Sequence, residues 1–179
     1  MRLFFALPLP SHVQAELATC QKIWSKTFTN VKWVKEENIH LTLKFLGEVS
    51  ANQLKQVAAA ARPALAGYHP FTIRVNRAGV FPHLQRARIL WVGLEDHNNM
   101  LTKLQRDLEK HLASLGFPYD TRSFTPHLTL GRLRQPTRIK LPVLPVDNLV
   151  IPVSNVVLYE SILNPQGPVY RQLLRFELQ

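Results

Sequence analysis

The tetrapeptide His40-Leu41-Thr42-Leu43 occurs a second time as His127-Leu128-Thr129-Leu130, and these two stretches decide the fold that we expect. They begin 87 positions apart (127 − 40), close to half of the 179 residues. Because alternate side chains of a β-strand share a face, each copy places its histidine and threonine on one face and its leucines on the other. The leucines suit a hydrophobic core, and the His/Thr pairs suit the walls of a shared cleft.

Similar elements are expected around the two copies. Strands are predicted at residues 2–7, 31–34, 39–46, 71–75, 87–94, 127–133, 155–163 and 170–178, with a turn-rich stretch at 78–82. Helices are predicted after Pro10, after Ser50 and over residues 98–115, where leucines recur at helical spacing. This alternation predicts an internal duplication, with two α+β lobes that join near residues 76–86, enclose a cleft and fold as one unit.

Two of the helix starts carry a capping-box pattern, in which a serine is followed three residues later by a glutamine. Ser11 and Gln14 form the first pattern, and Ser50 and Gln53 form the second. Pro63 is expected to bend or end the second helix, because proline lacks the backbone N–H that an α-helix needs.

Composition restricts the class of protein. Hydrophobic residues make up 46% of the chain, as in globular proteins and unlike disordered ones. The one cysteine, Cys20, excludes an internal disulfide, and its place on an apolar helical stripe indicates a core residue. No stretch approaches the ~20 apolar residues of a membrane span, and the N-terminus shows no signal sequence. We therefore expect a cytoplasmic protein, and a monomer because no extra interface is evident.

Basic residues exceed acidic ones, with 22 Lys and Arg against 12 Asp and Glu and a formal net charge of +10. Such an excess attracts polyanions and supports a nucleic-acid or nucleotide partner. Four of the basic residues form a cluster that directly follows the second motif: Arg132, Arg134, Arg138 and Lys140.

Some residues beside the motifs are further candidates. Arg132 is a possible phosphate ligand: strict alternation points it away from His127, but a bulge at Gly131 would re-aim it. Lys44 falls on the His40 face and is a second candidate. The three tryptophans are expected in the core rather than as base-stacking platforms; they are Trp24, Trp33 and Trp91.

The chemistry that suits the paired motif is acid–base catalysis on a phosphate ester. Histidine titrates near neutrality, so one imidazole can act as a base while another, protonated, acts as an acid. Threonine hydroxyls donate hydrogen bonds to phosphate oxygens without adding charge. Metal binding is the competing use of histidine, but it would need a third ligand and usually close spacing such as His-x-x-x-His, which the other histidines do not show. We expect neither a metal nor a cofactor.

At these residues the chain resembles the 2H phosphoesterase superfamily, which is named for two His-x-Thr-x motifs. More narrowly, it is similar to the RNA 2′,3′-cyclic phosphodiesterases, also called bacterial and archaeal 2′-5′ RNA ligases. The resemblance covers nearly the whole chain, including residues 2–6, 40–47, 79–82, 90–94, 125–132 and 161–170. It implies a single bilobal α+β domain over residues 1–179, with two pseudo-symmetric lobes whose antiparallel sheets face a central cleft and whose helices pack outside.

The resemblance also implies an activity, which is metal-independent hydrolysis of RNA ends with a 2′,3′-cyclic phosphate to leave a 2′-phosphate. His40 would protonate the leaving 3′ oxygen and His127 would activate water, while Thr42 and Thr129 would hold the phosphate. Two alternatives stay open. One is 2′-5′ joining of RNA at the same site, with a 5′-hydroxyl in place of water. The other is a non-catalytic module that binds RNA or nucleotides.

Overall fold

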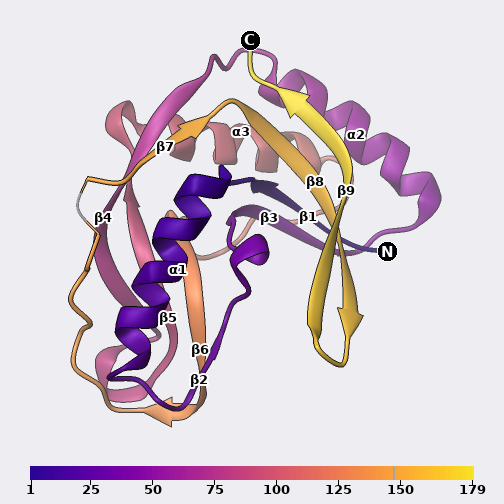
Figure 1. The fold of residues 1–179 in the computed structure, drawn as a ribbon. Helices are drawn as coiled ribbons and strands as arrows, with labels where there is room; N and C mark the ends of the chain where they lie inside the picture. Colours follow the sequence, from indigo (N-terminus) through magenta and orange to yellow (C-terminus); the bar gives the residue numbers. More distant parts are fainter. Residues whose placement is uncertain (147) are drawn as a thin grey trace.

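The computed structural model describes residues 1–146 and 148–179, and Figure 1 shows how their helices and strands are arranged. The described residues form nine strands: β1 (Arg2–Leu7), β2 (Val31–Trp33), β3 (Leu41–Glu48), β4 (Phe71–Phe81), β5 (Ala87–Glu95), β6 (His127–Thr137), β7 (Val150–Val153), β8 (Asn155–Asn164) and β9 (Gly167–Glu177). They also form three α-helices, α1 (Ser11–Ser25), α2 (Ala51–Leu65) and α3 (Met100–Ala113), and three short 3-10 helices, η1 (Glu36–Asn38), η2 (Leu84–Arg86) and η3 (His97–Asn99). The predicted α+β class is confirmed.

The strands pair into two antiparallel sheets, and each sheet carries one of the two motifs. The first sheet has the order β3-β1-β8-β9, and the second has the order β2-β6-β5-β4-β7. Both sheets combine strands from distant parts of the chain, because β8 pairs with β1 and β2 pairs with β6. Residues 76–86 form the end of β4, η2 and the turn between them, and the division into duplicated lobes at this place stays a prediction.

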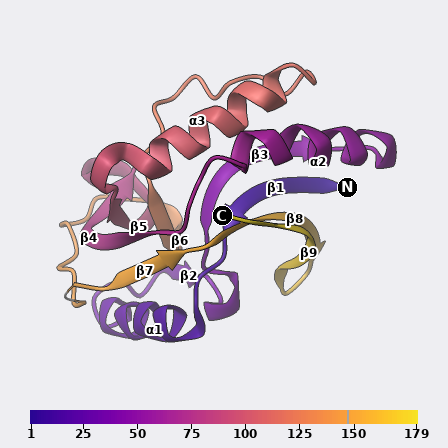
Figure 2. The ribbon, with the colours of Figure 1, turned by 90° about the horizontal axis from the view of Figure 1, so that it is seen from above.

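The helices pack on the outside of the sheets, as predicted. Figure 2 shows α2 and α3 side by side on one side of the molecule and α1 on the opposite side. Each helix buries an apolar stripe, and in α3 this stripe is made of fully buried leucines at helical spacing: Leu101, Leu104, Leu108 and Leu112. Cys20 lies on the buried stripe of α1, as expected for a core residue, and burial raises the pKa of its thiol to about 12.

One of the two predicted capping boxes is present. The Ser50 hydroxyl accepts the Gln53 backbone N–H at 3.3 Å, and the Gln53 side chain accepts the Ser50 backbone N–H at 3.0 Å. The box predicted at Ser11 is wrong, because α1 is capped at Pro10 and Ser11 is already inside its first turn. A hydroxyl at that place cannot reach the N–H groups that an N-cap side chain satisfies. Helix α2 ends two residues beyond Pro63, at Leu65.

The turn predicted at residues 78–82 is wrong, because β4 continues through Gly79 to Phe81 in register with β5. A Cβ atom at Gly79 would lie 2.2 Å from ring atoms of Trp91. The glycine therefore leaves room for an indole ring and does not make a turn. Strand β7 is not predicted from the sequence because it contains Pro152. It lies at the edge of the second sheet, where a missing N–H is tolerated.

Candidate active site

The two motif histidines come from different sheets and lie close enough to influence each other. His40 directly precedes β3, and His127 is the first residue of β6. Strands β3 and β6 contact each other, although they belong to separate sheets. A positive charge on His127 lowers the pKa of His40, so the two imidazoles are near enough to interact. Both rings are half-buried, so each has one side packed and one side open.

Each histidine is held by the same local hydrogen bond. The Nδ1–H of His40 donates to the carbonyl of Asn38 at 2.7 Å, and the Nδ1–H of His127 donates to the carbonyl of Thr125 at 2.6 Å. Because a carbonyl can only accept, these bonds assign the proton of the neutral ring to Nδ1 in both histidines. Nε2 is then the nitrogen that each ring presents for proton transfer.

Aromatic side chains surround both rings. The centroid of the His40 ring is 5.0 Å from that of Phe4 and 5.1 Å from that of Tyr170, which meets it edge-on. The His127 ring is 5.0 Å from Phe81 and 5.8 Å from Trp91. Each imidazole is therefore wedged between two aromatic rings of its own sheet, and this packing limits the directions in which it can point.

This packing also controls the charge of the site. Burial lowers the pKa of His40 from its usual 6.5 to about 4, and the opposing hydrogen bond to Asn38 recovers only part of the shift. Burial is also the main cause that lowers the pKa of His127, with a smaller contribution in the same direction from the positive charge of Arg132. Both imidazoles of the free site are therefore neutral at pH 7.

The two threonines of the motifs lie beside the histidines but differ in their contacts. The Thr42 hydroxyl is 3.0 Å from Nε2 of His40 and donates to it when the ring is neutral. Thr129 is half-exposed on the same strand as His127 and lies in register with Trp91. Hydroxyl groups are thus present in both halves of the site, as the alternation of the motifs predicts.

Arg132 is brought to the site by an irregularity of β6. The pairing of β6 with β5 shifts between Thr129 and Gly131, so that Leu130 is an extra residue on β6. Such a bulge turns the following side chains to the opposite faces, and Arg132 is exposed while Leu133 is buried. Burial raises the pKa of Tyr170 in the first sheet, and the positive charge of Arg132 partly offsets this. The guanidinium is therefore close to both sheets.

The expectation that Lys44 shares the face of His40 is wrong. The pairing of β3 with β1 shifts between Thr42 and Lys44, so that Leu43 is an extra residue and Lys44 turns into the core. There its ammonium is 2.6 Å from a carboxylate oxygen of Glu109 and also donates to the Pro118 carbonyl. Lys44 is only 7% exposed, so it cannot reach a ligand beside His40.

Sequence reasoning missed the aromatic wall of the site. Trp91 is 6% exposed and belongs to the core as expected, but its indole also packs, tilted, against the His127 ring at a centroid distance of 5.8 Å. The sequence does not mark the other three aromatic residues as candidates, because their local sequence does not distinguish them from aromatic residues of the core; they are Phe4, Phe81 and Tyr170. The usable signal is Gly79, since a glycine in the middle of a strand often marks a place where a large ring lies against the backbone.

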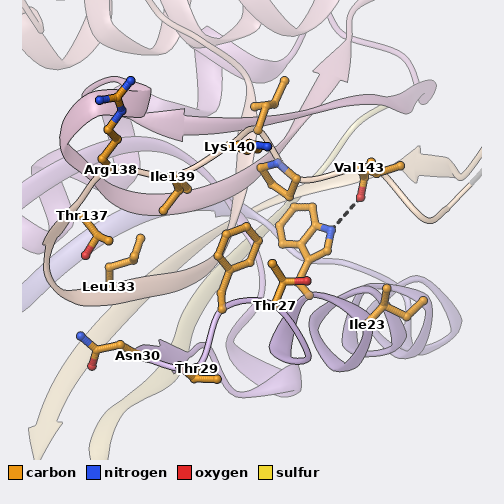
Figure 3. A pocket seen from close by; sticks show the side chains of 14 residues that line it. Ile23, Thr27, Thr29, Asn30, Leu133, Thr137, Arg138, Ile139, Lys140 and Val143 are labelled. Atoms are coloured by element: carbon orange, nitrogen blue, oxygen red, sulfur yellow. Dashed lines mark hydrogen bonds between the residues drawn. The ribbon is translucent and has the colours of Figure 1, made fainter.

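A hollow of about 610 Å³ lies apart from the motif histidines and their aromatic neighbours, and Figure 3 shows it. Its walls come from the end of α1, residues 27–30 and residues 137–143, and none of the five predicted site residues lines it. The indole N–H of Trp24 donates to the Val143 carbonyl at 2.8 Å in its wall. Arg138 and Lys140 line this hollow, so the predicted basic cluster divides between two places.

Neither a candidate metal centre nor a helix that could span a membrane is found in the part of the chain that the structure describes. Within residues 1–146 and 148–179, no three His, Cys, Asp or Glu side chains are grouped as ligands of one ion. The helices in the same ranges are too short or too polar to cross a bilayer.

Two sheets that each bring a His-x-Thr segment to one site define the class of protein, and comparison with known families identifies it as a phosphoesterase. The profile described as LigT like Phosphoesterase matches residues 7–91 and again residues 92–170, and the chain belongs to that family.

Relatives of similar length support this assignment. The chain is 35% identical to the RNA 2′,3′-cyclic phosphodiesterase of Methanothermobacter thermautotrophicus, over 99% of both proteins. Among solved structures it is similar to TT0787 of Thermus thermophilus, with a TM-score of 0.87 and 32% identity over 99% of this chain and 98% of that one. It is also similar to E. coli LigT in complex with 3′-AMP, with a TM-score of 0.85 and 30% identity over 99% and 97% of the two chains.

Proposed function

We propose that this phosphoesterase hydrolyses RNA ends that carry a 2′,3′-cyclic phosphate, leaving a 2′-phosphate, by general acid–base catalysis with two histidines and without a metal. One observation carries the proposal: Nδ1 of both His40 and His127 is engaged by a backbone carbonyl, so Nε2, which in His40 also contacts the Thr42 hydroxyl, is the nitrogen that each ring presents for proton transfer. Relatives across the whole length are named RNA 2′,3′-cyclic phosphodiesterase, which supports the choice of substrate.

The proposed reaction needs one base and one acid. His127 Nε2 takes a proton from water, whose oxygen then attacks phosphorus, and the bond between phosphorus and the 3′ oxygen breaks. His40 Nε2 gives a proton to that oxygen, so that a 3′-hydroxyl and a 2′-phosphate leave the site. His127 ends protonated and His40 neutral, and proton exchange with solvent restores the starting state. The choice of His40 as acid follows the family resemblance.

Substrate binding favours uptake from solvent of the proton that the free site lacks. Both histidines have lowered pKa values in the free protein, and the acid must nevertheless be protonated. A phosphodiester carries a negative charge, and a nearby negative charge raises the pKa of an imidazole. The bound cyclic phosphate thus favours one imidazolium in the pair, which gives the site an acid only when the substrate is present.

The phosphate itself is assigned to Thr42, Thr129 and Arg132. The two hydroxyls donate hydrogen bonds from opposite sheets, and the Arg132 guanidinium adds a positive charge near His127. Negative charge grows on the phosphoryl oxygens as water attacks, so donors fixed in advance stabilise the transition state more than the ground state.

The test is product analysis with short RNAs that end in a 2′,3′-cyclic phosphate. Wild type is expected to produce 2′-phosphate ends in the presence of a chelator, and His40→Ala and His127→Ala are each expected to lose most turnover, by ~10²–10⁴-fold. His111→Ala is a matched control, because His111 also donates from Nδ1 to a backbone carbonyl but lies in α3, away from both motifs.

Each part of the proposal has an outcome that contradicts it. Full activity of either site variant rules out the two-histidine mechanism, and loss of wild-type turnover in chelator rules out independence from metal. Tight binding of the RNA end without any product identifies a binding module. If RNA with a 5′-hydroxyl is joined faster than the cyclic phosphate is hydrolysed in the same tube, 2′-5′ ligation is the main activity.

A further inference from the structure

Two buried glutamines occupy equivalent places behind the two motifs. The extra residue of each bulge is the fourth residue of its motif, Leu130 in β6 and Leu43 in β3. The Gln21 side-chain amide in α1 donates to the Leu130 carbonyl at 2.8 Å, and the Gln105 amide in α3 donates to the Leu43 carbonyl at 3.4 Å. The two helices lie on opposite sides of the molecule (Figure 2). Each nevertheless presents a glutamine amide to the carbonyl of the fourth residue of a motif.

Glutamine is an unusual choice for these positions. Gln21 and Gln105 are only 8% and 6% exposed, and the remaining buried positions of α1 are apolar. Burying an amide costs free energy unless its hydrogen bonds are satisfied, and burying a backbone carbonyl without a donor has a similar cost. A carbonyl oxygen can accept two hydrogen bonds, so a helix side chain can add a second donor to the carbonyl of the extra residue at the bulge.

Gln21 connects the bulge to a second strand. The same side-chain amide nitrogen also donates to the Val34 carbonyl at 2.8 Å, while the Val34 N–H donates to the Leu130 carbonyl at 2.9 Å. Both amide protons are therefore used. These bonds fix the end of β2 against the bulge of β6, and from Val34 the chain continues through η1 to His40.

The bulge decides which side chain enters the site. In an uninterrupted strand, the face of His127 and Thr129 continues with Gly131 and Leu133, and Arg132 turns into the core. With Leu130 as an extra residue, Leu133 is buried at 7% exposure and Arg132 is exposed beside His127. An interaction that favours the bulged register therefore also favours the placement of Arg132.

We propose that Gln21 is a positioning residue that holds the bulge after Thr129 and thereby keeps Arg132 beside His127. Gln105 has the corresponding role behind Thr42, where the bulge turns Lys44 into the core. The importance of this placement for turnover rests on the proposed function. The placement itself does not, and it can be measured in a protein that is not turning over.

The first measurement is the pKa of His127, followed by NMR of the imidazole in the free protein. Arg132 lowers this pKa, so Arg132→Ala is expected to raise it. Gln21→Met removes both donors but suits a buried helix position, and it is expected to raise the His127 pKa in the same direction. Gln105→Met is the matched control, because it removes the buried amide of α3 that bonds to β3 of the other sheet, and it is expected to leave the His127 pKa unchanged.

The second measurement is a double-mutant cycle with the cyclic-phosphate substrate. Gln21→Met is expected to lower kcat/KM on the order of tenfold, as a displaced charge-assisted hydrogen bond would. In the Arg132→Ala background the same substitution is expected to have little further effect, because the group that it positions is already absent. Gln21→Asn, whose amide is on a shorter side chain, is the second variant if Gln21→Met folds poorly.

Two outcomes overturn the proposal. If Gln21→Met lowers the melting temperature but leaves the His127 pKa and kcat/KM unchanged, Gln21 only stabilises the fold. If the effects of Gln21→Met and Arg132→Ala multiply, the two residues act independently. A shift of the His127 pKa in a protein that does not hydrolyse the cyclic phosphate would instead support the placement and contradict only the proposed function.

Discussion

The positive charge of Arg132 acts on His127, although strict alternation along a strand would place these two side chains on opposite faces of the sheet. The extra residue Leu130 removes this conflict. Because the same guanidinium also lowers the pKa of Tyr170 in the other sheet, it lies close to both sheets, between which we propose that the phosphate is held.

Replacing Arg132 by alanine is therefore expected to lower kcat/KM by ~10²-fold, because a preorganised donor to the phosphoryl oxygens is lost. Arg132→Lys keeps the charge but not the forked geometry of the guanidinium. Its kcat/KM is expected to lie between those of Arg132→Ala and wild type. Arg138→Ala is the control, since Arg138 lines the separate hollow of Figure 3. Equal losses in the Arg132→Ala and Arg138→Ala variants would show that only net charge matters.

The pH dependence of kcat/KM is expected to be bell-shaped, with its maximum on the acidic side of pH 6.5. The active form of the free enzyme carries one proton on the pair of histidines, and this form is most populated between the two pKa values. The pKa of His40 is about 4, and that of His127 is below 6.5. Rates measured from pH 3 to pH 9 test this, and a maximum above pH 7.5 would contradict it.

The same burial is expected to make the fold sensitive to acid. The unfolded chain protonates His40 near pH 6.5, whereas the folded protein does so only near pH 4. As the pH falls through this window the unfolded state binds more protons, so the free energy of unfolding decreases, by up to about 3 kcal/mol from this residue. Denaturant unfolding at pH 7 and at pH 4 should show that the free energy of unfolding decreases less for His40→Asn than for wild type. Parallel decreases would exclude this origin.

The sequence predicts which motif side chains share a face better than it predicts the strands that carry them. Alternation within each motif correctly places histidine and threonine on one face, because the first three residues of each motif precede the bulge. Beyond the fourth residue the same rule fails for Lys44, since a bulge is determined by tertiary pairing and by a glutamine about 60 residues away, Gln105. The strand predicted at residues 71–75 is too short for a related reason, because Gly79 serves a contact with Trp91 that local sequence does not show.

The buried pair of Lys44 and Glu109 gives a prediction about stability alone. Both side chains are less than 10% exposed, so removal of one partner leaves the other charge buried without compensation. Lys44→Met and Glu109→Leu are each expected to lower the free energy of unfolding by ~3–5 kcal/mol, while the double variant recovers much of the loss. Turnover per folded molecule should stay close to wild type in the double variant. A large loss of kcat in the double variant would show that Lys44 contributes to the active site after all.

Gly79 links packing of the sheet to the position of His127. A methyl group at Gly79 would lie 2.2 Å from the Trp91 ring, which is only 6% exposed and also packs against the His127 imidazole. The ring must therefore move, so Gly79→Ala is expected to destabilise the fold by ~1–3 kcal/mol and to lower kcat as His127 is displaced. Gly67→Ala is the matched control, because its Cβ would meet nothing within 4 Å. Thermal melts and initial rates for both variants test the link, and unchanged kcat in a destabilised Gly79→Ala protein would show that Trp91 does not position His127.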